Sequence, residues 1–165
     1  DMEVMDFPDS GLKEMDVRIL EQAVKNHIEK LKPHIVATYP VHGISGFHDH
    51  LVTHAVVKRV YLEIRDAGTE FPKRLAFWTM PDSDEPTSKP GELPRLKLTE
   101  EDLIDCIFPL DEDDIKAMKE SLKCYASYQE VIKKIDPVEQ IGDKAHFEIF
   151  GENFDPVLDD LTKEM

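Results

Sequence analysis

A short apolar segment, a glycine-rich loop and a helical segment follow one another in the first third of the chain. Residues 34–39 read His-Ile-Val-Ala-Thr-Tyr, residues 43–46 read Gly-Ile-Ser-Gly, and apolar residues then recur at helical spacing over 51–65. A nearly continuous apolar segment is typical of a strand in a parallel sheet that is covered on both faces. A second helical pattern over 16–31 precedes this strand. The order strand, loop, helix therefore predicts an α/β protein built from βαβ units.

The rest of the chain continues the alternation. We expect further strands over 2–7, 74–80, 105–108 and 144–150, and one long helix over 111–135. A chain of 165 residues suits a single α/β domain, residues 1–165. Residues 81–94 are polar and rich in proline, and a loop of this length is typical of a lid or of a simply mobile segment.

The charge of the chain argues against two classes of partner. With 20 basic and 35 acidic residues the net charge is −15, which should repel nucleic acid and anionic membrane surfaces. We expect no membrane partner and a cytoplasmic protein, because the sequence shows neither a membrane span nor a secretory signal. Cys106 and Cys124 lie in apolar surroundings far apart in sequence, which favours buried thiols over a disulfide.

Two histidines and an aspartate stand where the loop meets the helix. His48, Asp49 and His50 fall at the carboxyl end of the expected strand, where α/β sheets bind ligands. Imidazole is a common zinc ligand, and a neighbouring carboxylate can orient it. The alternative is a polar helix start, with Asp49 in the first turn and both histidines solvated. His50 and His54 lie on one helix face, at the spacing of paired zinc ligands, but the glutamate that follows the first histidine in metalloproteases is absent, so a ligand role for His54 has no motif to support it.

The residues around this cluster resemble the LmbE-like/PIG-L family of zinc-dependent N-acetylglucosaminyl deacetylases. Residues 32–34, Lys-Pro-His, fall on the family's "K-P-D" before a strand, and residues 43–46 fall on its "G-V-S-G" loop. Residues 47–50, Phe-His-Asp-His, fall on "H-P-D-H". This places His50 on a zinc-ligand position and Phe47 where the family has a histidine.

The resemblance implies a three-layer α/β/α Rossmann-like domain with a mostly parallel sheet. It also implies that this chain is N-terminally incomplete, corresponding to the C-terminal two thirds of that domain. The family's "A-H-P-D-D" motif, which supplies two zinc ligands and the general base, does not occur in this sequence. The segment alone is therefore expected to be inactive and to bind zinc weakly.

The family's roles can be carried onto matching positions. The resemblance implies that His50 binds zinc and that Asp49 takes part in catalysis. His48, which falls on the family's proline, is the expected catalytic substitute for the histidine that Phe47 replaces. Asp9, in a turn similar to the family's "P-D-G-G-L", and Ser45 are the expected substrate-binding residues. The implied reaction is zinc-dependent removal of an N-acetyl group from an N-acetylglucosamine-type sugar conjugate, carried out by a homo-oligomer.

Two other functions fit the same residues. A non-catalytic relative could bind a sugar or nucleotide-sugar in the same crevice, which Phe47, Tyr125 and Tyr128 favour. Both tyrosines fall on a helix that resembles the family's "A-L-x-x-H-x-S-Q", where they replace its histidine and glutamine. A plain α/β module for assembly would leave the histidines without a role. We expect His27 to pack half-buried and His146 to lie at the surface.

Overall fold

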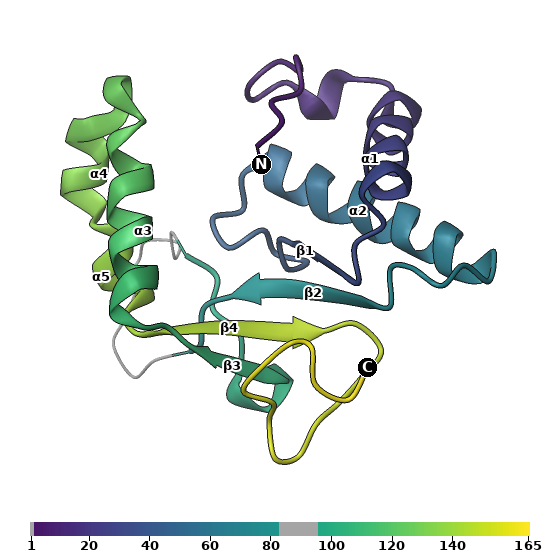
Figure 1. Cartoon of the computed structure of the whole chain (residues 1–165). Coiled ribbons are helices and arrows are strands. Elements are labelled where there is room, and N and C mark those ends of the chain that lie inside the picture. Colours follow the sequence, from purple (N-terminus) through teal and green to yellow (C-terminus); the bar gives the residue numbers. More distant parts are fainter. Residues whose placement is uncertain (1, 83–95) are drawn as a thin grey trace.

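The computed structural model describes residues 2–82 and 96–165 (Figure 1). Its elements are α1 (Val17–Leu31), β1 (Ile35–Thr38), α2 (His48–Asp66), β2 (Arg74–Thr79), β3 (Cys106–Pro109), α3 (Glu112–Lys123), α4 (Gln129–Ile135), α5 (Pro137–Ile141) and β4 (Lys144–Ile149). Most of the predicted loop over 81–94 lies outside the described residues. No helix within those two ranges is both long and apolar enough to cross a membrane.

The four strands form one mixed sheet in the order β1-β2-β4-β3. β1 and β2 are parallel, with Ile35 opposite Arg74, as expected for a βαβ unit. β4 runs antiparallel to both of its neighbours, β2 and β3. The α/β class is therefore confirmed, whereas the prediction of a mostly parallel sheet is wrong for the described strands.

The helical hairpin between β3 and β4 explains the antiparallel pairing. A single crossover helix would carry the chain to the far end of the sheet, but α3 and α4 lead away from the sheet and back again (Figure 1). The end of β3 and the start of β4 consequently meet, where the N–H of Leu110 donates to the carbonyl of Asp143 at 2.8 Å. β4 can then only return alongside β3 in the opposite direction.

The long helix predicted over 111–135 is interrupted. Its start is as expected, because Asp111 and Asp114 form a reciprocal capping box. α3 ends at Lys123, and a 3-10 turn at Ala126–Tyr128 leads into α4. The side-chain amide of Gln129 donates to two carbonyls at the break, those of Leu122 and Tyr125. The break places both tyrosines of this region near the tip of the hairpin.

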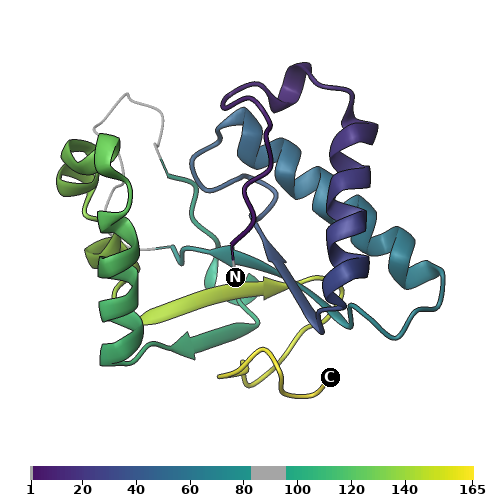
Figure 2. The same ribbon diagram turned by 45° about the horizontal axis from the view of Figure 1, so that its top comes forward.

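The two faces of the sheet are covered differently. α1 and α2 lie on one face, and the chain after β4 crosses the other as an irregular segment (Figures 1 and 2). The helical face holds a core of Val57, Tyr61, Leu75 and Phe77. The opposite core contains Cys106, Ile149 and Leu158. A three-layer α/β/α arrangement is thus not found in the described residues, since a loop segment takes the place of the third layer.

Residues 2–7, predicted as a strand, do not form one. The segment runs as irregular chain and is tied to α1 through Glu3, whose carboxylate lies 3.4 Å from both His27 and Lys30. His27 is half-buried, as expected. Met2 and Val4 are largely exposed, so the apolar residues that suggested a strand have no sheet to pack on in this structure.

The two cysteines differ in accessibility. Both are free thiols, but Cys106 is buried and Cys124 is exposed, so the prediction of two buried thiols is wrong for Cys124. Burial raises the pKa of the Cys106 thiol to about 11, which keeps it protonated and unreactive. A thiol reagent at pH 8 should therefore label one cysteine in the native protein and both after denaturation. Rapid native labelling of Cys106, measured by mass spectrometry, would contradict this packing.

Candidate functional site

The glycine-rich loop after β1 holds the imidazole of His50 in one orientation. The His50 Nδ1 lies 2.9 Å from the carbonyl oxygen of Gly43 and 3.0 Å from the hydroxyl of Ser45. A carbonyl can only accept, so Nδ1 carries the proton and the neutral ring keeps a lone pair on Nε2. Tyr39 stacks on the same ring, with centroids 4.0 Å apart and planes within 9°.

Gly43 is required where the loop passes the start of α2. Its φ of +64° lies in the left-handed region, and a Cβ there would come within 2.9 Å of the Cβ of His50. A larger residue would push the histidine away from the carbonyl that holds it. The glycine that suggested a functional loop in the sequence is thus explained by close approach of backbone and side chain.

A cavity of about 230 Å³ opens beside His50. It is lined by Asp9, Ser10, Phe47, His48, Asp49, His50 and Tyr128. Four of the five predicted site residues therefore line one cavity. The fifth, Ser45, does not line it and instead contacts the ring of His50. Its predicted contact with substrate stays a prediction.

Three segments distant in sequence build this cavity. Asp9 and Ser10 belong to the turn before α1, the residues from Phe47 to His50 open α2, and Tyr128 comes from the turn between α3 and α4. Tyr128 and Phe47 are more than half exposed, so two aromatic rings stand at the rim of a polar cavity. The sequence suggested both rings, but not that they border the same cavity.

Asp49 connects two of these segments. Its Oδ1 accepts a hydrogen bond from the backbone N–H of Leu12 at 3.2 Å, which ties the turn carrying Asp9 to the first turn of α2. A carboxylate is also favoured there by the positive end of the helix dipole. This contact shapes the cavity. It does not test the catalytic role of Asp49, which stays a prediction.

Two substitutions separate the charge of Asp49 from its hydrogen bond. Asp49→Asn keeps an acceptor for Leu12, whereas Asp49→Ala removes it and should cost about 1 kcal/mol of folding stability. We expect faster hydrogen exchange at the Leu12 amide in the alanine variant only, measured by NMR. Equal exchange in both variants would show that the contact does not hold the turn.

Comparison with known proteins supports the family suggested by the sequence. The model of the PIG-L family, described as GlcNAc-PI de-N-acetylase, matches residues 1–61. Residues 1–61 are thus similar to the PIG-L family. This match contains β1, the glycine-rich loop, most of α2 and every residue lining the cavity except Tyr128. No curated protein in the comparison matches the chain.

Similarity to the PIG-L family implies a metal ion, and His50 fits one ligand position. Metal-bound histidines commonly donate their second ring N–H to a carbonyl or carboxylate, as His50 does to Gly43. Within the described residues, however, no three His, Cys, Asp or Glu side chains are grouped so that they could hold a metal ion. Because a catalytic zinc needs three protein ligands, these residues offer one ligand and not a complete site.

His54 has a different environment from His50. Its ring is buried, donates from Nδ1 to the carbonyl of Tyr39 at 2.7 Å and contacts the ring of Phe77. Burial lowers its pKa, which keeps it neutral at neutral pH. His54 does not line the cavity beside His50. Its contacts account for the residue without a ligand role.

Sequence reasoning missed His42, which lies at the other end of the same loop. Its Nδ1 accepts the backbone N–H of Ile44 at 3.1 Å, and its Nε2 lies 3.2 Å from the hydroxyl of Thr99. The one signal in the sequence was its position at the start of the glycine-rich loop, where a histidine side chain can accept a hydrogen bond from the backbone two residues later. Nothing in the sequence indicated that Thr99, far along the chain, would be its partner.

Proposed function

We propose that this chain contributes to a zinc-dependent hydrolase that removes the N-acetyl group from an N-acetylglucosamine-type sugar conjugate. The observation that carries the proposal is His50 itself. Its ring is locked by Gly43 with Nε2 free, beside a cavity whose lining includes His48 and Asp49. When bound, zinc would polarise the amide carbonyl and lower the pKa of a water molecule. His50 would supply one ligand, and the remaining ligands would come from outside the described residues.

The other residues of the cavity have separate roles in this proposal. Asp49 fixes the turn that carries Asp9 and places a negative charge beside His48. His48 is exposed and lines the cavity, so its imidazole can contact a bound molecule. We assign it the part of the family histidine that Phe47 replaces. The loss of that histidine from its usual position should make the enzyme slow.

The rim of the cavity fits the ring of a sugar. Phe47 and Tyr128 offer flat apolar faces, while the carboxylates of Asp9 and Asp49 can accept hydrogen bonds from hydroxyl groups. Binding sites commonly combine aromatic walls with a few polar groups that fix orientation. This composition supports a carbohydrate ligand for either an enzyme or a binding protein.

A non-catalytic sugar-binding relative is the second candidate. Two observations favour it: the described residues do not form a three-ligand metal group, and Phe47 stands where the family has a histidine. The two functions share the cavity and differ in zinc dependence. A hydrolase needs His50 for turnover, whereas a binding protein needs only the side chains that line the cavity and contact the sugar.

Binding and turnover measured on the same samples distinguish these functions. The full-length protein, which would supply the remaining ligands, is titrated with an N-acetylglucosamine conjugate while acetate release is followed, with and without added zinc. Zinc-dependent release of acetate supports the hydrolase. Sugar binding that is independent of zinc and gives no acetate supports the binder. Neither binding nor turnover would contradict both functions.

Tyr128 tests the rim under either function. Tyr128→Ala should weaken binding of the sugar conjugate by ~10-fold, because removing a ring that covers a ligand costs about 1–2 kcal/mol. Tyr128→Phe should keep the affinity within ~3-fold if the ring face alone matters. Tyr125→Ala is a matched control, since Tyr125 is equally exposed in the same turn but does not line the cavity. Equal losses for Tyr125→Ala and Tyr128→Ala would contradict the assignment of Tyr128.

A further inference from the structure

Ile44 adopts a backbone conformation that isoleucine rarely takes. Its φ of +60° lies in the left-handed region, and its side chain is buried. A β-branched residue is crowded there, and such residues persist only where the surroundings hold them. Ile44 therefore needs contacts that hold this conformation in the middle of the loop that carries Gly43.

Both backbone polar groups of Ile44 are bonded. Its N–H donates to the Nδ1 of His42 at 3.1 Å, and its carbonyl accepts the N–H of Lys97 at 2.6 Å. The first bond closes a local ring within the loop. The second ties the loop to the strand-like segment that follows the undescribed residues.

The hydrogen bond from Ile44 to His42 requires one tautomer of His42, and the Thr99 hydroxyl together with the Glu148 carboxylate favours that tautomer. Because Nδ1 accepts from Ile44, the proton of the neutral ring is on Nε2 and is donated to Thr99. The Thr99 hydroxyl in turn donates to the carboxylate of Glu148 on β4 at 2.9 Å. Burial, followed by the nearby charge of Lys97, lowers the pKa of His42 and favours this neutral ring.

The position of Ile44 decides where the carbonyl of Gly43 points. The peptide group between these residues turns with the φ of Ile44, so relaxation to negative φ would rotate the Gly43 oxygen away from His50. That oxygen accepts the Nδ1 proton of His50 and thereby leaves Nε2 free. The state of His50 is therefore coupled to a hydrogen bond made by His42, although no contact between the two rings is needed.

We propose that His42 is a positioning residue for His50. By accepting the N–H of Ile44, it holds the strained loop in the one shape that presents Nε2 of His50 to the cavity. The importance of Nε2 rests on the proposed function, but the positioning itself can be measured without any activity.

Three substitutions of His42 separate its two bonds. In His42→Asn the amide oxygen can take the place of Nδ1 and accept from Ile44. In His42→Gln the amide nitrogen can take the place of Nε2 and donate to Thr99, and His42→Ala makes neither bond. His34→Ala serves as a control, because His34 is an exposed histidine outside the loop.

The readout is the tautomer of His50, measured from its ring ¹⁵N shifts at pH 8. We expect the Nδ1–H form in the wild type, in His42→Asn and in His34→Ala, and its loss in His42→Ala and His42→Gln. If His42→Ala does not fold, the asparagine and glutamine variants still give opposite predictions. An unchanged His50 tautomer in folded His42→Gln or His42→Ala would overturn the proposal.

Zinc titration of the same variants distinguishes failure of this proposal from failure of the proposed function. Loss of the Nδ1–H form should weaken zinc binding at His50 by ~10-fold or more, as removal of outer-sphere partners does in other sites. If the tautomer responds as expected but zinc never binds His50, positioning by His42 stands and the zinc hydrolase fails. If zinc binds His50 and no variant alters the tautomer, the reverse holds.

Discussion

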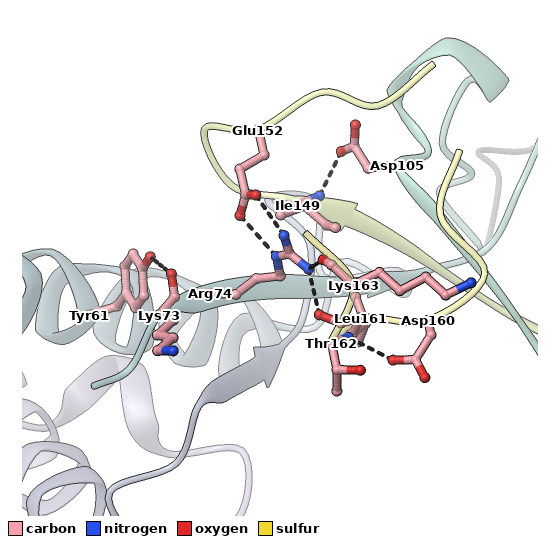
Figure 3. Close-up of polar contacts among 10 residues, drawn as sticks. All are labelled: Tyr61, Lys73, Arg74, Asp105, Ile149, Glu152, Asp160, Leu161, Thr162 and Lys163. Carbon is pink, nitrogen blue, oxygen red and sulfur yellow. Dashed lines mark hydrogen bonds and ion pairs between the residues drawn. The ribbon is translucent and has the colours of Figure 1, made fainter. Parts of the chain in front are cut away.

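Arg74→Met should lower the free energy of unfolding by about 3 kcal/mol, because Arg74 is a fully buried cation whose bonds join β2 to the end of the chain. Its guanidinium makes a two-point contact with the carboxylate of Glu152, at 2.9 and 2.7 Å (Figure 3). The remaining nitrogen donates to the carbonyls of Leu161 and Lys163. The ring of Phe154 lies over the guanidinium, 5.4 Å away.

The expected loss comes from the partners left behind. Methionine fills similar space but leaves two carbonyls without a donor and Glu152 without its cation. The side chain of Glu152 is 33% exposed, and this partial solvation places the loss at the lower end of the range for buried pairs. Arg74→Lys should recover part of the loss, since lysine keeps the charge without the planar fork.

Denaturant unfolding checks this prediction against an exposed arginine. Arg65 pairs with Asp66 on the surface of α2, and Arg65→Met should cost less than about 1 kcal/mol. A similar small change in both variants would show that the segment after β4 is not held by Arg74. The same contacts explain the roles of Glu152 and Phe154, because the carboxylate pairs with Arg74 and the ring lies over its guanidinium.

In the full-length protein, His50→Ala should abolish most zinc binding and all zinc-dependent turnover. The ring that is locked by Gly43 and stacked on Tyr39 is removed, and no other histidine lines the cavity except His48. Loss of a direct ligand should exceed the ~10–100-fold effect typical of outer-sphere partners. Isothermal titration with zinc and the acetate-release assay measure the two effects.

A matched histidine variant shows whether the effect is specific. His34→Ala removes an exposed imidazole outside the cavity and should leave zinc affinity unchanged. A His50→Ala protein with the thermal stability of wild type and the same zinc affinity would remove His50 from the metal site. The non-catalytic binder would then be the better account of the cavity.

Local sequence patterns predicted the structure of residues 16–66 well. The helix beginning at Asp16, the strand before the glycine-rich loop and the helix opening at His48 all form where spacing and capping indicated. The cavity also forms at the carboxyl end of β1, where α/β sheets bind ligands. These features depend on residues close together in the sequence, and periodicity reports such interactions directly.

Features set by distant residues were not predictable in the same way. The strand order depends on the helical hairpin, whose turn is stabilised by the side chain of Gln129 and not by a proline or glycine. Tyr128 lines the cavity only because the turn of that hairpin lies on the same side of the molecule as the first residues of α2. Likewise, the partnership of His42 with Thr99 spans 57 positions, beyond the reach of local patterns.

The most direct test of the central claim follows the ring nitrogens of all histidines while zinc is added to the whole chain. The structure assigns Nδ1–H and a free Nε2 to His50. The account therefore predicts that zinc shifts the Nε2 resonance of His50 first, while its Nδ1 proton remains bonded to Gly43. Zinc that shifts another histidine first, or that leaves Nε2 of His50 unchanged, would contradict it.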